Sequence, residues 1–432
     1  MMQDQKEAVG VDVVLDVGER QRTSADASGR NARVLVAFTA VTNLTDGVTK
    51  VALPLLASSL TRSPALVSGV LFTMTLPWLL VSLHIGVLVD RADRRRLLWT
   101  ANALRVAAVG VLMAAVASDA IGLPLLFACA AVLGVAEVIA LTSASALVPD
   151  AVAPEGRERV NAVMTGVETV ANEFVGPFVG GMLVAVGASL ALGVSAGGYL
   201  AATALLPLLV GRFRVVRADG GPKVSVNRQI GEGVSFLWRH RLLRTLSLSV
   251  TVLVTCWAAW FALMPLVATR VWALSPTGYG ALVGALGVGG LVGTLVVGLV
   301  NRLLGRRWAM FANIFAAASM VTVPAVTANV WATGAAAFLG GLGSTLWVVN
   351  ARTIGQTLVP PDMMGRFSAA SRLFGWGPLP LGSAAAGALA QAVGYRVAFG
   401  AFAVAALTVV VPFLRNLTPE ALADVEARMP SR

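Results

Sequence analysis

Residues 86–96 read Gly86-Val-Leu-Val-Asp-Arg-Ala-Asp-Arg-Arg-Arg96, and this short basic stretch separates two long apolar segments. The segment before it, 64–89, has His84 as its only ionisable group, and the segment after it, 97–118, has only Arg105. An apolar run of about 20 residues crosses roughly 30 Å of hydrocarbon as a helix. The stretch is therefore predicted to be a tight turn between two membrane-spanning helices.

The composition is that of a membrane protein. With 57% hydrophobic residues, 13% charged residues and a mean hydropathy of +0.78, it excludes an ordinary soluble domain. The net charge of +11 does not indicate a nucleic-acid partner, because the basic residues lie in short loops between apolar runs. Cys129 and Cys256 lie inside apolar runs, where we expect them to pack rather than to form a disulfide or a metal site.

The pattern of apolar runs predicts an all-α membrane protein with about twelve transmembrane helices. The long connection after six runs, and the echo of Val148-Pro149-Asp150 in Val359-Pro360-Pro361-Asp362, predict two pseudo-symmetric six-helix bundles. The runs are 34–60, 64–90, 97–118, 121–149, 160–187, 190–210, 245–270, 277–300, 308–327, 330–358, 366–392 and 395–415. The expected parts of the chain are a disordered cytoplasmic tail (1–33), an N-terminal bundle (34–210), a cytoplasmic connector (211–244), a C-terminal bundle (245–415) and a second cytoplasmic tail (416–432).

The connector ends in an amphipathic segment, 227–243, with Ile230, Val234, Leu237 and Trp238 on one helical face. This pattern predicts a helix that lies along the inner leaflet and tethers the two bundles.

Most loop Lys and Arg residues lie in the set of loops that contains 86–96 and the connector. Those loops and both termini are therefore predicted to be cytoplasmic. Arginine far outnumbers lysine in the chain, a bias that favours a GC-rich bacterial genome. The expected location is the plasma (inner) membrane of a bacterium, with multiple passes.

The pattern Gly86-x-x-x-Asp90-Arg91-x-x-Arg94-Arg95 resembles the loop 2–3 signature of the major facilitator superfamily of secondary transporters. A degraded copy, Gly-Leu-Val-Asn-Arg-Leu-Leu-Gly-Arg-Arg, occupies residues 298–307. The resemblance implies two bundles that rock about a central cavity, while these loops lock one face. The implied lock residues are Gly86, Asp90, Arg91, Arg94, Arg95, Asn301 and Arg302. Asp93 stands where the signature usually has Gly, so it either strains the turn or recruits an arginine, and a loop that only sets orientation remains an alternative.

Residues Asn161, Glu168, Asn172, Gly176 and Pro177 follow Arg159 at spacings that resemble a subgroup of drug, macrolide and siderophore exporters. The element Gly176-Pro177-x-x-Gly180-Gly181 also resembles one found in span five of exporters, although Asn172 stands where an upstream glycine is usual. Gly180 and Gly181 allow a facing helix to approach, and Pro177 permits a bend. Ordinary small-residue packing is the alternative.

Acidic residues inside the apolar runs occur only in the first half: Asp46, Glu137, Glu168 and Glu173. A charged group in hydrocarbon costs about 2.5–3.5 kcal/mol on insertion scales, so these groups should face a cavity or one another. Removal from water favours the protonated form of a carboxyl, which makes the four acids, with Arg105, candidates for proton coupling. Asp46 is the first choice and Glu137 the second. In the structural alternative Lys50 neutralises Asp46, one turn away, and Arg105 pairs with Glu137 or Glu168.

The largest aromatic or amide side chains that can line a central cavity are Trp78, Trp257, Trp260, Trp347, Asn350 and Trp376. Tryptophan also serves as an interfacial anchor in membranes, which is the alternative. No lysine follows a glycine, so there is no phosphate-binding Gly-Lys-Ser/Thr loop, and the two histidines fit no metal or catalytic pattern. We expect no enzyme site, no cofactor and no metal.

These features together favour export of an amphipathic small molecule, such as a drug, an antibiotic or a siderophore-like compound, in exchange for protons. The expected partners are this substrate, protons and the lipid bilayer. Uptake of a polar nutrient is the alternative within transporters, and a membrane sensor or scaffold is the alternative outside them.

Asp90→Asn is expected to leave membrane insertion intact and to impair transport. An acid at the C-terminal end of a helix opposes the helix dipole unless a basic group or a neighbouring helix start partners it, so its charge should matter to the lock. Transport by vesicles that contain the variant tests this. A wild-type rate in a well-expressed Asp90→Asn protein would contradict it.

Overall fold

The computed structural model describes residues 4–89, 91–211, 226–360 and 363–427, and all regular structure in these residues is helical. The first half contains α1 (Asp4–Leu60), α2 (Pro64–Leu80), α3 (Ser82–Val89), α4 (Arg94–Ala117), α5 (Leu123–Ala151), α6 (Pro154–Glu168), the π-helical segment η1 (Thr169–Val175), α7 (Gly176–Val186), α8 (Ala188–Leu205) and the 3-10 turn η2 (Leu206–Leu208).

The second half begins after the connector helix α9 (Val226–Arg239). It contains α10 (Arg241–Leu266), the π-helical segment η3 (Val267–Val271), α11 (Pro276–Val326), α12 (Val330–Leu358), α13 (Met364–Trp376), α14 (Pro378–Val393), α15 (Tyr395–Thr408), α16 (Val410–Asn416) and α17 (Pro419–Ala427).

The predicted all-helical class is confirmed, and the predicted apolar runs fall on helices. Eight helical segments of the described chain are long and apolar enough to cross a membrane. The runs 277–300 and 308–327 both fall on α11, which Gly305 divides because its φ of 76° and ψ of 156° are not helical. Glycine has no Cβ and adopts positive φ without strain, so the kink coincides with a glycine of the second basic loop.

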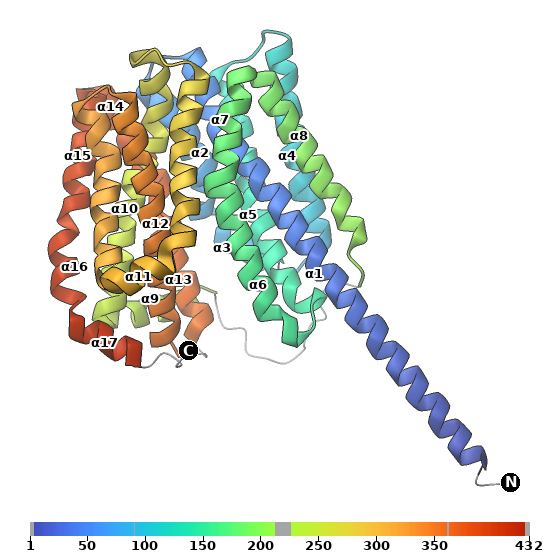
Figure 1. Cartoon of the computed structure of the whole chain (residues 1–432). Helices are drawn as coiled ribbons and strands as arrows, with labels where there is room; N and C mark the ends of the chain where they lie inside the picture. Colours follow the sequence, from blue (N-terminus) through green and yellow to red (C-terminus); the bar gives the residue numbers. More distant parts are fainter. Residues whose placement is uncertain (1–3, 90, 212–225, 361–362, 428–432) are drawn as a thin grey trace.

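Helix α1 begins at Asp4, well before the expected start of the first span at residue 34. Figure 1 shows its first part projecting away from the other helices. The sequence favoured a disordered tail over 1–33, whereas the described backbone is helical from Asp4. Residues 4–33 contain no proline, so no residue in this stretch blocks continuation of the helix through a missing N–H group.

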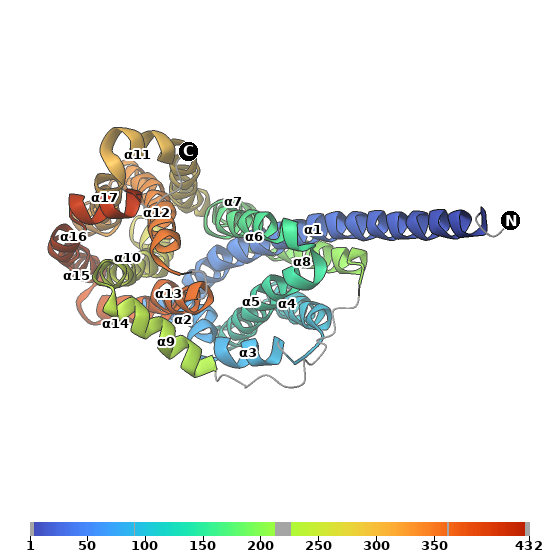
Figure 2. The same cartoon turned by 90° about the horizontal axis from the view of Figure 1, so that it is seen from below.

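The helices form two groups. Figure 2 shows α1–α8 gathered on one side and α10–α16 on the other. Helix α2 packs against α14, and α7 packs against α11. The two halves therefore meet along α2 and α7 of the first half and along α11 and α14 of the second half.

The connector helix α9 packs against α13 of the second half. Leu237 is buried in an apolar cluster with Leu243, Val359 and Ala370, whereas Trp238 on the same predicted face is 48% exposed. Glu232 forms an ion pair of 3.0 Å with Arg366. The predicted amphipathic helix is therefore present, but part of its apolar face contacts protein rather than lipid, because the start of α13 covers it.

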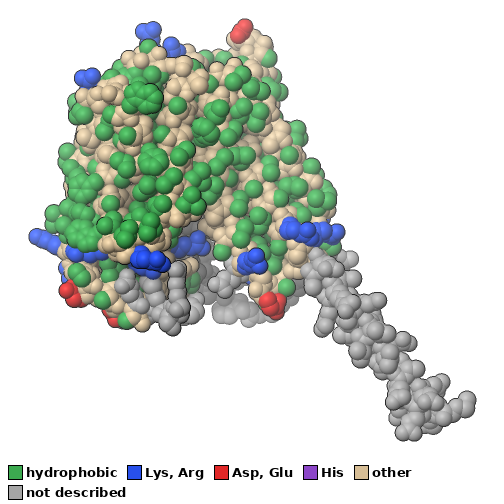
Figure 3. All heavy atoms as spheres, in the orientation of Figure 1, with side chains coloured by type: hydrophobic (Ala, Val, Ile, Leu, Met, Phe, Trp, Pro, Cys, Tyr) green, Lys and Arg blue, Asp and Glu red, His purple; other side chains and the backbone are tan. Residues whose placement is uncertain are grey.

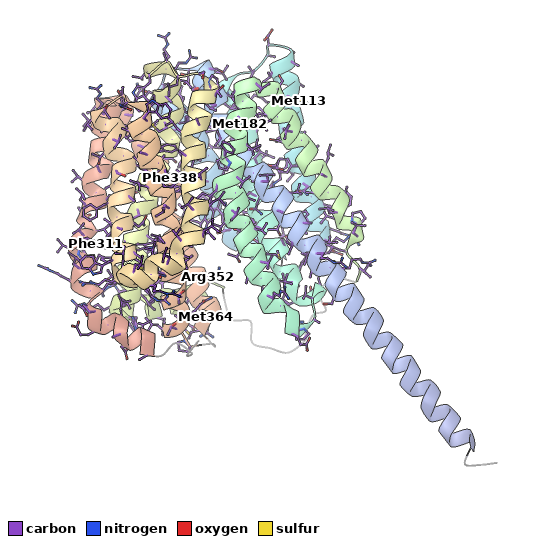
Figure 4. All side chains as sticks on the ribbon, viewed as in Figure 1. Met113, Met182, Phe311, Phe338, Arg352 and Met364 are labelled. Atoms are coloured by element: carbon purple, nitrogen blue, oxygen red, sulfur yellow. The ribbon has the colours of Figure 1, made fainter. Side chains whose placement is uncertain are left out.

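Apolar side chains cover the sides of the molecule between two charged ends. Figure 3 shows hydrophobic surface over both halves and a band of Lys and Arg at the lower edge. Met113 of α4 and Met182 of α7 (Figure 4) are 38% and 50% exposed on these sides. We call the end with Arg94, Arg157, Arg302 and α9 the basic end, and the end with Arg62, Arg270 and Arg396 the opposite end. Arg352 near the end of α12 is also exposed (Figure 4) and lay inside an expected span.

The two halves are tied together at the opposite end. Arg270 of η3 donates hydrogen bonds to the carbonyl oxygens of Ser58 (2.7 Å) and Ser59 (2.8 Å) at the end of α1. The last carbonyls of a helix have no partner within the helix, so this guanidinium caps α1 across the halves. Ser63 also donates to Gln391 at 2.8 Å. At the basic end, by contrast, Figure 3 shows the molecule hollowed between the halves.

Close contact between α7 and α11 also holds the two halves together. Gly181 of α7 lies against Gly280 of α11, and a Cβ on Gly280 would be 2.8 Å from the carbonyl carbon of Gly181. Only glycine at these positions lets the two backbones approach so closely.

Arg270→Ala is expected to increase the population that is open at the opposite end. Hydrogen bonds to a charged donor stabilise by about 1.5–3 kcal/mol when shielded from water, and 1.4 kcal/mol changes the ratio of two states tenfold. The measurement is a pulsed electron paramagnetic resonance distance between spin labels at Ala120 and Val397, with Cys129 and Cys256 replaced by Ala.

Arg396→Ala is the matched control, since its Nε donates to Tyr395 of its own helix. The Arg270→Ala distances should include a longer component that Arg396→Ala lacks. Identical distributions in the two variants would contradict the role of Arg270.

Candidate functional site

A buried polar cluster lies inside the first half. Its members come from different helices that pack side by side. They are Asn43, Asp46 and Lys50 of α1, Asn102 and Arg105 of α4, Glu137 of α5, Asn172 of η1 and Tyr199 of α8. An apolar bundle tolerates so many polar groups only if they satisfy one another.

Arg105 is fully buried, and Asp46 is its ion-pair partner. Arg105 Nη2 donates to Asp46 Oδ2 at 2.7 Å, and Tyr199 donates its hydroxyl to Asp46 Oδ1 at 2.8 Å. Arg105 Nη1 also donates to the Asn102 side-chain oxygen at 3.2 Å. The suggested pairing of Arg105 with Glu137 or Glu168 is therefore not present, because the guanidinium faces α1 and α8.

Lys50 forms the second ion pair of the cluster. Its Nζ lies 2.9 Å from Glu137 Oε1 and 2.9 Å from the side-chain oxygen of Asn172. Asn172 donates to Asn43 at 3.1 Å and to Glu137 at 3.3 Å. Lys50 thus neutralises Glu137 rather than Asp46, which corrects the suggested contact one turn along α1.

The π-helical segment η1 positions Asn172. Pro177 has no N–H group, so it cannot donate to the carbonyl of residue 173, and the chain adopts a wider turn before α7. Gly47 of α1 lies against this turn, and a Cβ there would be 2.8 Å from the Asn172 carbonyl oxygen. Gly180 packs against Val48 in the same way. The bend predicted at Pro177 is therefore present as a π-helix that brings Asn172 to α1.

Glu173 differs from the other acids of this region. Its side chain is partly exposed, and it has no hydrogen-bond or ion-pair partner among the described residues. Lys50 is close enough to attract it, and Glu168 is close enough to repel it. Glu168 has an interaction of its own. Of the four predicted proton-coupling acids, Asp46 and Glu137 are paired, and Glu173 is partly exposed beside them.

Two of the predicted aromatic residues meet between the halves. The rings of Trp78 on α2 and Trp376 on α13 stack with centroids 5.5 Å apart. Lys50 Nζ lies 5.7 Å from the centroid of the Trp376 ring. The polar cluster and this aromatic pair are therefore joined through Lys50.

The remaining predicted substrate-binding residues have other surroundings. Trp260 and Trp347 are buried in the core of the second half, where Trp347 lies 6.0 Å from the ring of Phe413. Trp257 is partly exposed beside Phe261. Of the three, only Trp257 keeps a surface that a substrate can reach without repacking of the core.

Asn350 is fully buried and is not available to a substrate. It exchanges two hydrogen bonds of 2.9 Å with Asn301, which was predicted to belong to the lock. An amide side chain can donate and accept at once, so the two asparagines satisfy each other. Asn301 therefore ties α11 to α12 within the second half.

Loop 86–96 is described except for Asp90, which lies outside the described residues. Asp93 is the N-cap of α4 and accepts from the backbone N–H groups of Arg95 (2.9 Å) and Arg96 (3.1 Å). Asp93 therefore neither strains the turn nor recruits an arginine side chain. It caps the helix, and a carboxylate at a helix N-terminus is stabilising. Arg94 pairs with Asp150 and donates to the Ala146 carbonyl at 3.0 Å.

The other predicted lock residues make fewer contacts. Arg91 and Arg302 are exposed, Arg95 is partly exposed, and a Cβ on Gly86 would meet open space. The one ion pair described for this loop, between Arg94 and Asp150, therefore joins α4 to α5 within the first half.

Sequence reasoning missed the roles of Tyr199, Asn43, Asn102 and Asn172 in the cluster. Tyr199 could have been found as a phenol inside an apolar run, because buried tyrosine hydroxyls usually have a partner. Among the described residues no group of three His, Cys, Asp or Glu side chains could hold a metal ion.

Helical spans, paired basic loops and a buried charge cluster define a membrane transporter of the major facilitator superfamily. The chain belongs to the transmembrane secretion effector family, whose model matches residues 25–431. It is a transporter and not an enzyme.

Known relatives are drug exporters by name. The chain is 28% identical over 410 residues to the multidrug efflux pump Tap of Mycolicibacterium fortuitum, which covers 90% of this chain and 97% of that protein. It is 31% identical over 280 residues to Tap of Mycobacterium tuberculosis, which covers 60% of this chain and 65% of the relative.

Solved structures share the fold at low identity. A bacterial homologue of the iron transporter ferroportin in an inward-facing state superposes with a TM-score of 0.66 at 18% identity, over 90% of this chain and 98% of that chain. The nucleoside transporter NupG superposes with a TM-score of 0.67 at 10% identity, over 89% of this chain and 100% of that chain. These two structures support the fold alone.

Asp46→Asn is expected to destabilise the protein more than Arg105→Gln. A guanidinium cannot lose its proton, whereas an unpaired carboxylate can become neutral by taking one up. Removal of one partner of a buried pair costs about 3–5 kcal/mol, and we expect Asp46→Asn to reach this range. The measurement is thermal unfolding of the purified variants.

The double variant Asp46→Asn/Arg105→Gln is the matched control, because it leaves neither charge unpaired. It should unfold at a higher temperature than Asp46→Asn alone. If Asp46→Asn were as stable as the wild type, the ion pair would not be a structural requirement.

Proposed function

We propose that the protein is a secondary active exporter that exchanges protons for an amphipathic small molecule by alternating access. The proposal includes twelve transmembrane helices in two pseudo-symmetric six-helix bundles. The observation that carries it is the buried cluster around Lys50, which contacts an aromatic pair between the halves and has Glu173 beside it, partly exposed.

Glu173 is the acid best suited to carry the proton. Asp46 pairs with Arg105 and accepts a hydrogen bond from Tyr199, and Glu137 is paired with Lys50. Protonation of either acid would leave a buried cation without its partner, which is costly. Glu173 can gain or lose a proton without breaking an ion pair. Glu173 therefore replaces Asp46 as the first choice for the acid that carries the proton.

Lys50 can link the proton to the substrate. A ligand shifts the balance between two facing states only by its difference in affinity for them. A charge on Glu173 attracts Lys50, and Lys50 also contacts the ring of Trp376 in the second half. Proton binding at Glu173 therefore changes the attraction that acts on a contact between the two halves.

The substrate class follows from the exposed aromatic groups. Trp78 and Trp376 offer aromatic surface beside Lys50, and Trp257 of α10 is also partly exposed. Aromatic faces bind apolar ring systems and cations, so a drug-like amphiphile with a basic group fits best. Export is favoured over uptake because relatives are named multidrug efflux pumps.

The basic end faces the cytoplasm in this proposal, in agreement with the positive-inside rule. Both termini are then cytoplasmic, and the protein resides in the plasma membrane of a bacterium. Asp90, Arg91, Arg94 and Arg302 close the basic end when the opposite end opens.

Glu173→Gln is expected to abolish uphill, proton-driven efflux and to leave substrate binding within about twofold of wild type. The amide keeps the shape of the side chain but cannot bind a proton. The measurement is efflux of ethidium from proteoliposomes with an imposed pH gradient, together with ethidium binding by the same preparation.

Glu155→Gln is the matched control, since Glu155 is an exposed acid in the first turn of α6. It should retain pH-driven efflux. Retention of full uphill efflux by Glu173→Gln would remove Glu173 from the mechanism, and an absence of efflux by the wild type across a panel of drugs would overturn the exporter proposal itself.

A further inference from the structure

A cavity of about 480 Å³ lies at the opposite end, where the two halves meet. It is separate from the polar cluster and from the aromatic pair, with which it shares no lining residue. Its walls come from the start of α2, the end of α10 with η3, and the junction of α14 and α15. The polar groups that they contribute include Arg62, Arg270 and Tyr395.

The basic residues of the opposite end gather at this cavity. Arg62 and Arg270 line it, and Arg396 donates from Nε to the hydroxyl of Tyr395, a third lining residue, at 3.2 Å. Arg270 is held in place by the carbonyl oxygens of Ser58 and Ser59. Its positive charge is therefore fixed at the wall before any ligand arrives.

No acidic group among the described lining residues balances these charges. The sequence from 245 to 415 contains a single acid, Asp362, which falls in the sequence between α12 and α13. Three arginines with no acid beside them create a positive potential that attracts an anion.

The rest of the wall is apolar. Leu263, Leu266, Val267 and Val271 form one side of the cavity. The volume is in the range of about 300–1,000 Å³ that is typical of small-ligand sites. A ligand that fits must combine an anionic group with an apolar body.

We propose that this cavity binds an amphiphilic anion whose phosphate or carboxylate group lies beside the lining residues Arg62 and Arg270, with Arg396 next to it through Tyr395. Arginine forms paired, charge-assisted hydrogen bonds with such groups. The apolar body of the ligand lies along Leu263, Leu266 and Val267. Two kinds of molecule combine an anionic group with an apolar body. They are an anionic lipid in the adjacent leaflet and a soluble organic anion. The proposal does not depend on the proposed export, because it concerns binding alone.

The test is a calorimetric titration of 1-naphthyl phosphate into the full-length protein in nanodiscs of phosphatidylcholine. We expect 1-naphthyl phosphate to bind at least tenfold more tightly than either 1-naphthol or inorganic phosphate, because the site requires both parts of the ligand. The double variant Arg62→Gln/Arg396→Gln should weaken binding by about tenfold or more. Both side chains are exposed, and its unfolding temperature should equal that of the wild type.

Arg239→Gln is the matched control, because it removes one exposed arginine at the basic end. It should leave the affinity unchanged. Equal affinity of the wild type and the double variant for 1-naphthyl phosphate would overturn the proposal, and so would equal binding of 1-naphthol and 1-naphthyl phosphate. Loss of affinity in Arg239→Gln as large as in the double variant would also overturn it.

A second arm distinguishes the two sources. Phosphatidylglycerol in the nanodiscs should weaken the binding of 1-naphthyl phosphate if the anionic lipid occupies the cavity. Unchanged binding in these nanodiscs assigns the cavity to a soluble anion. Both results support the site, and neither requires transport, so failure of the export proposal would not affect them.

Discussion

The structure of the first half depends on one charge that cannot be neutralised. Arg105 is fully buried in an apolar helix bundle, and a guanidinium keeps its proton at any physiological pH. An uncompensated ion in such surroundings costs several kcal/mol. Asp46, Tyr199 and Asn102 form the compensating hydrogen-bond network. The positions of α1, α4 and α8 relative to one another follow from this requirement, because each helix must bring its polar group to the same point.

Helix α1 carries both ion pairs of the cluster on one side. Asp46 and Lys50 are four residues apart, so they lie one above the other on the helix surface. Each nevertheless pairs with a different part of the bundle, Asp46 with α4 and α8 and Lys50 with α5 and η1. Gly47 lies between them and leaves the space that the backbone of η1 occupies. The absence of a side chain at this position is therefore as necessary to the cluster as the charged groups.

Hydropathy along the sequence could identify the helices, since each helix depends on residues that are close in the chain. The kink at Gly305 and the turn before Pro177 also have local causes that the sequence contains. The charge pairs could not be predicted in this way, because Asp46 and Lys50 each use partners far along the chain. Residue type also failed to predict which way a side chain faces. Trp347 and Asn350 are suited to a substrate cavity by chemistry, but helix packing turns both into the core of the second half.

Helix α1 connects the buried cluster to the opposite end of the molecule. Asp46 and Lys50 lie in its second half, and the carbonyl oxygens of Ser58 and Ser59 at its end are held by Arg270 of the second half. An α-helix rises 1.5 Å per residue, so about 12 Å of α1 separate Lys50 from Ser58. Pro54 lies inside this stretch and removes one helical hydrogen bond. A change of charge near Lys50 therefore acts on the same helix that the opposite-end contact holds. Since the two halves also touch through Lys50 and Trp376, any rocking motion must alter the surroundings of this lysine.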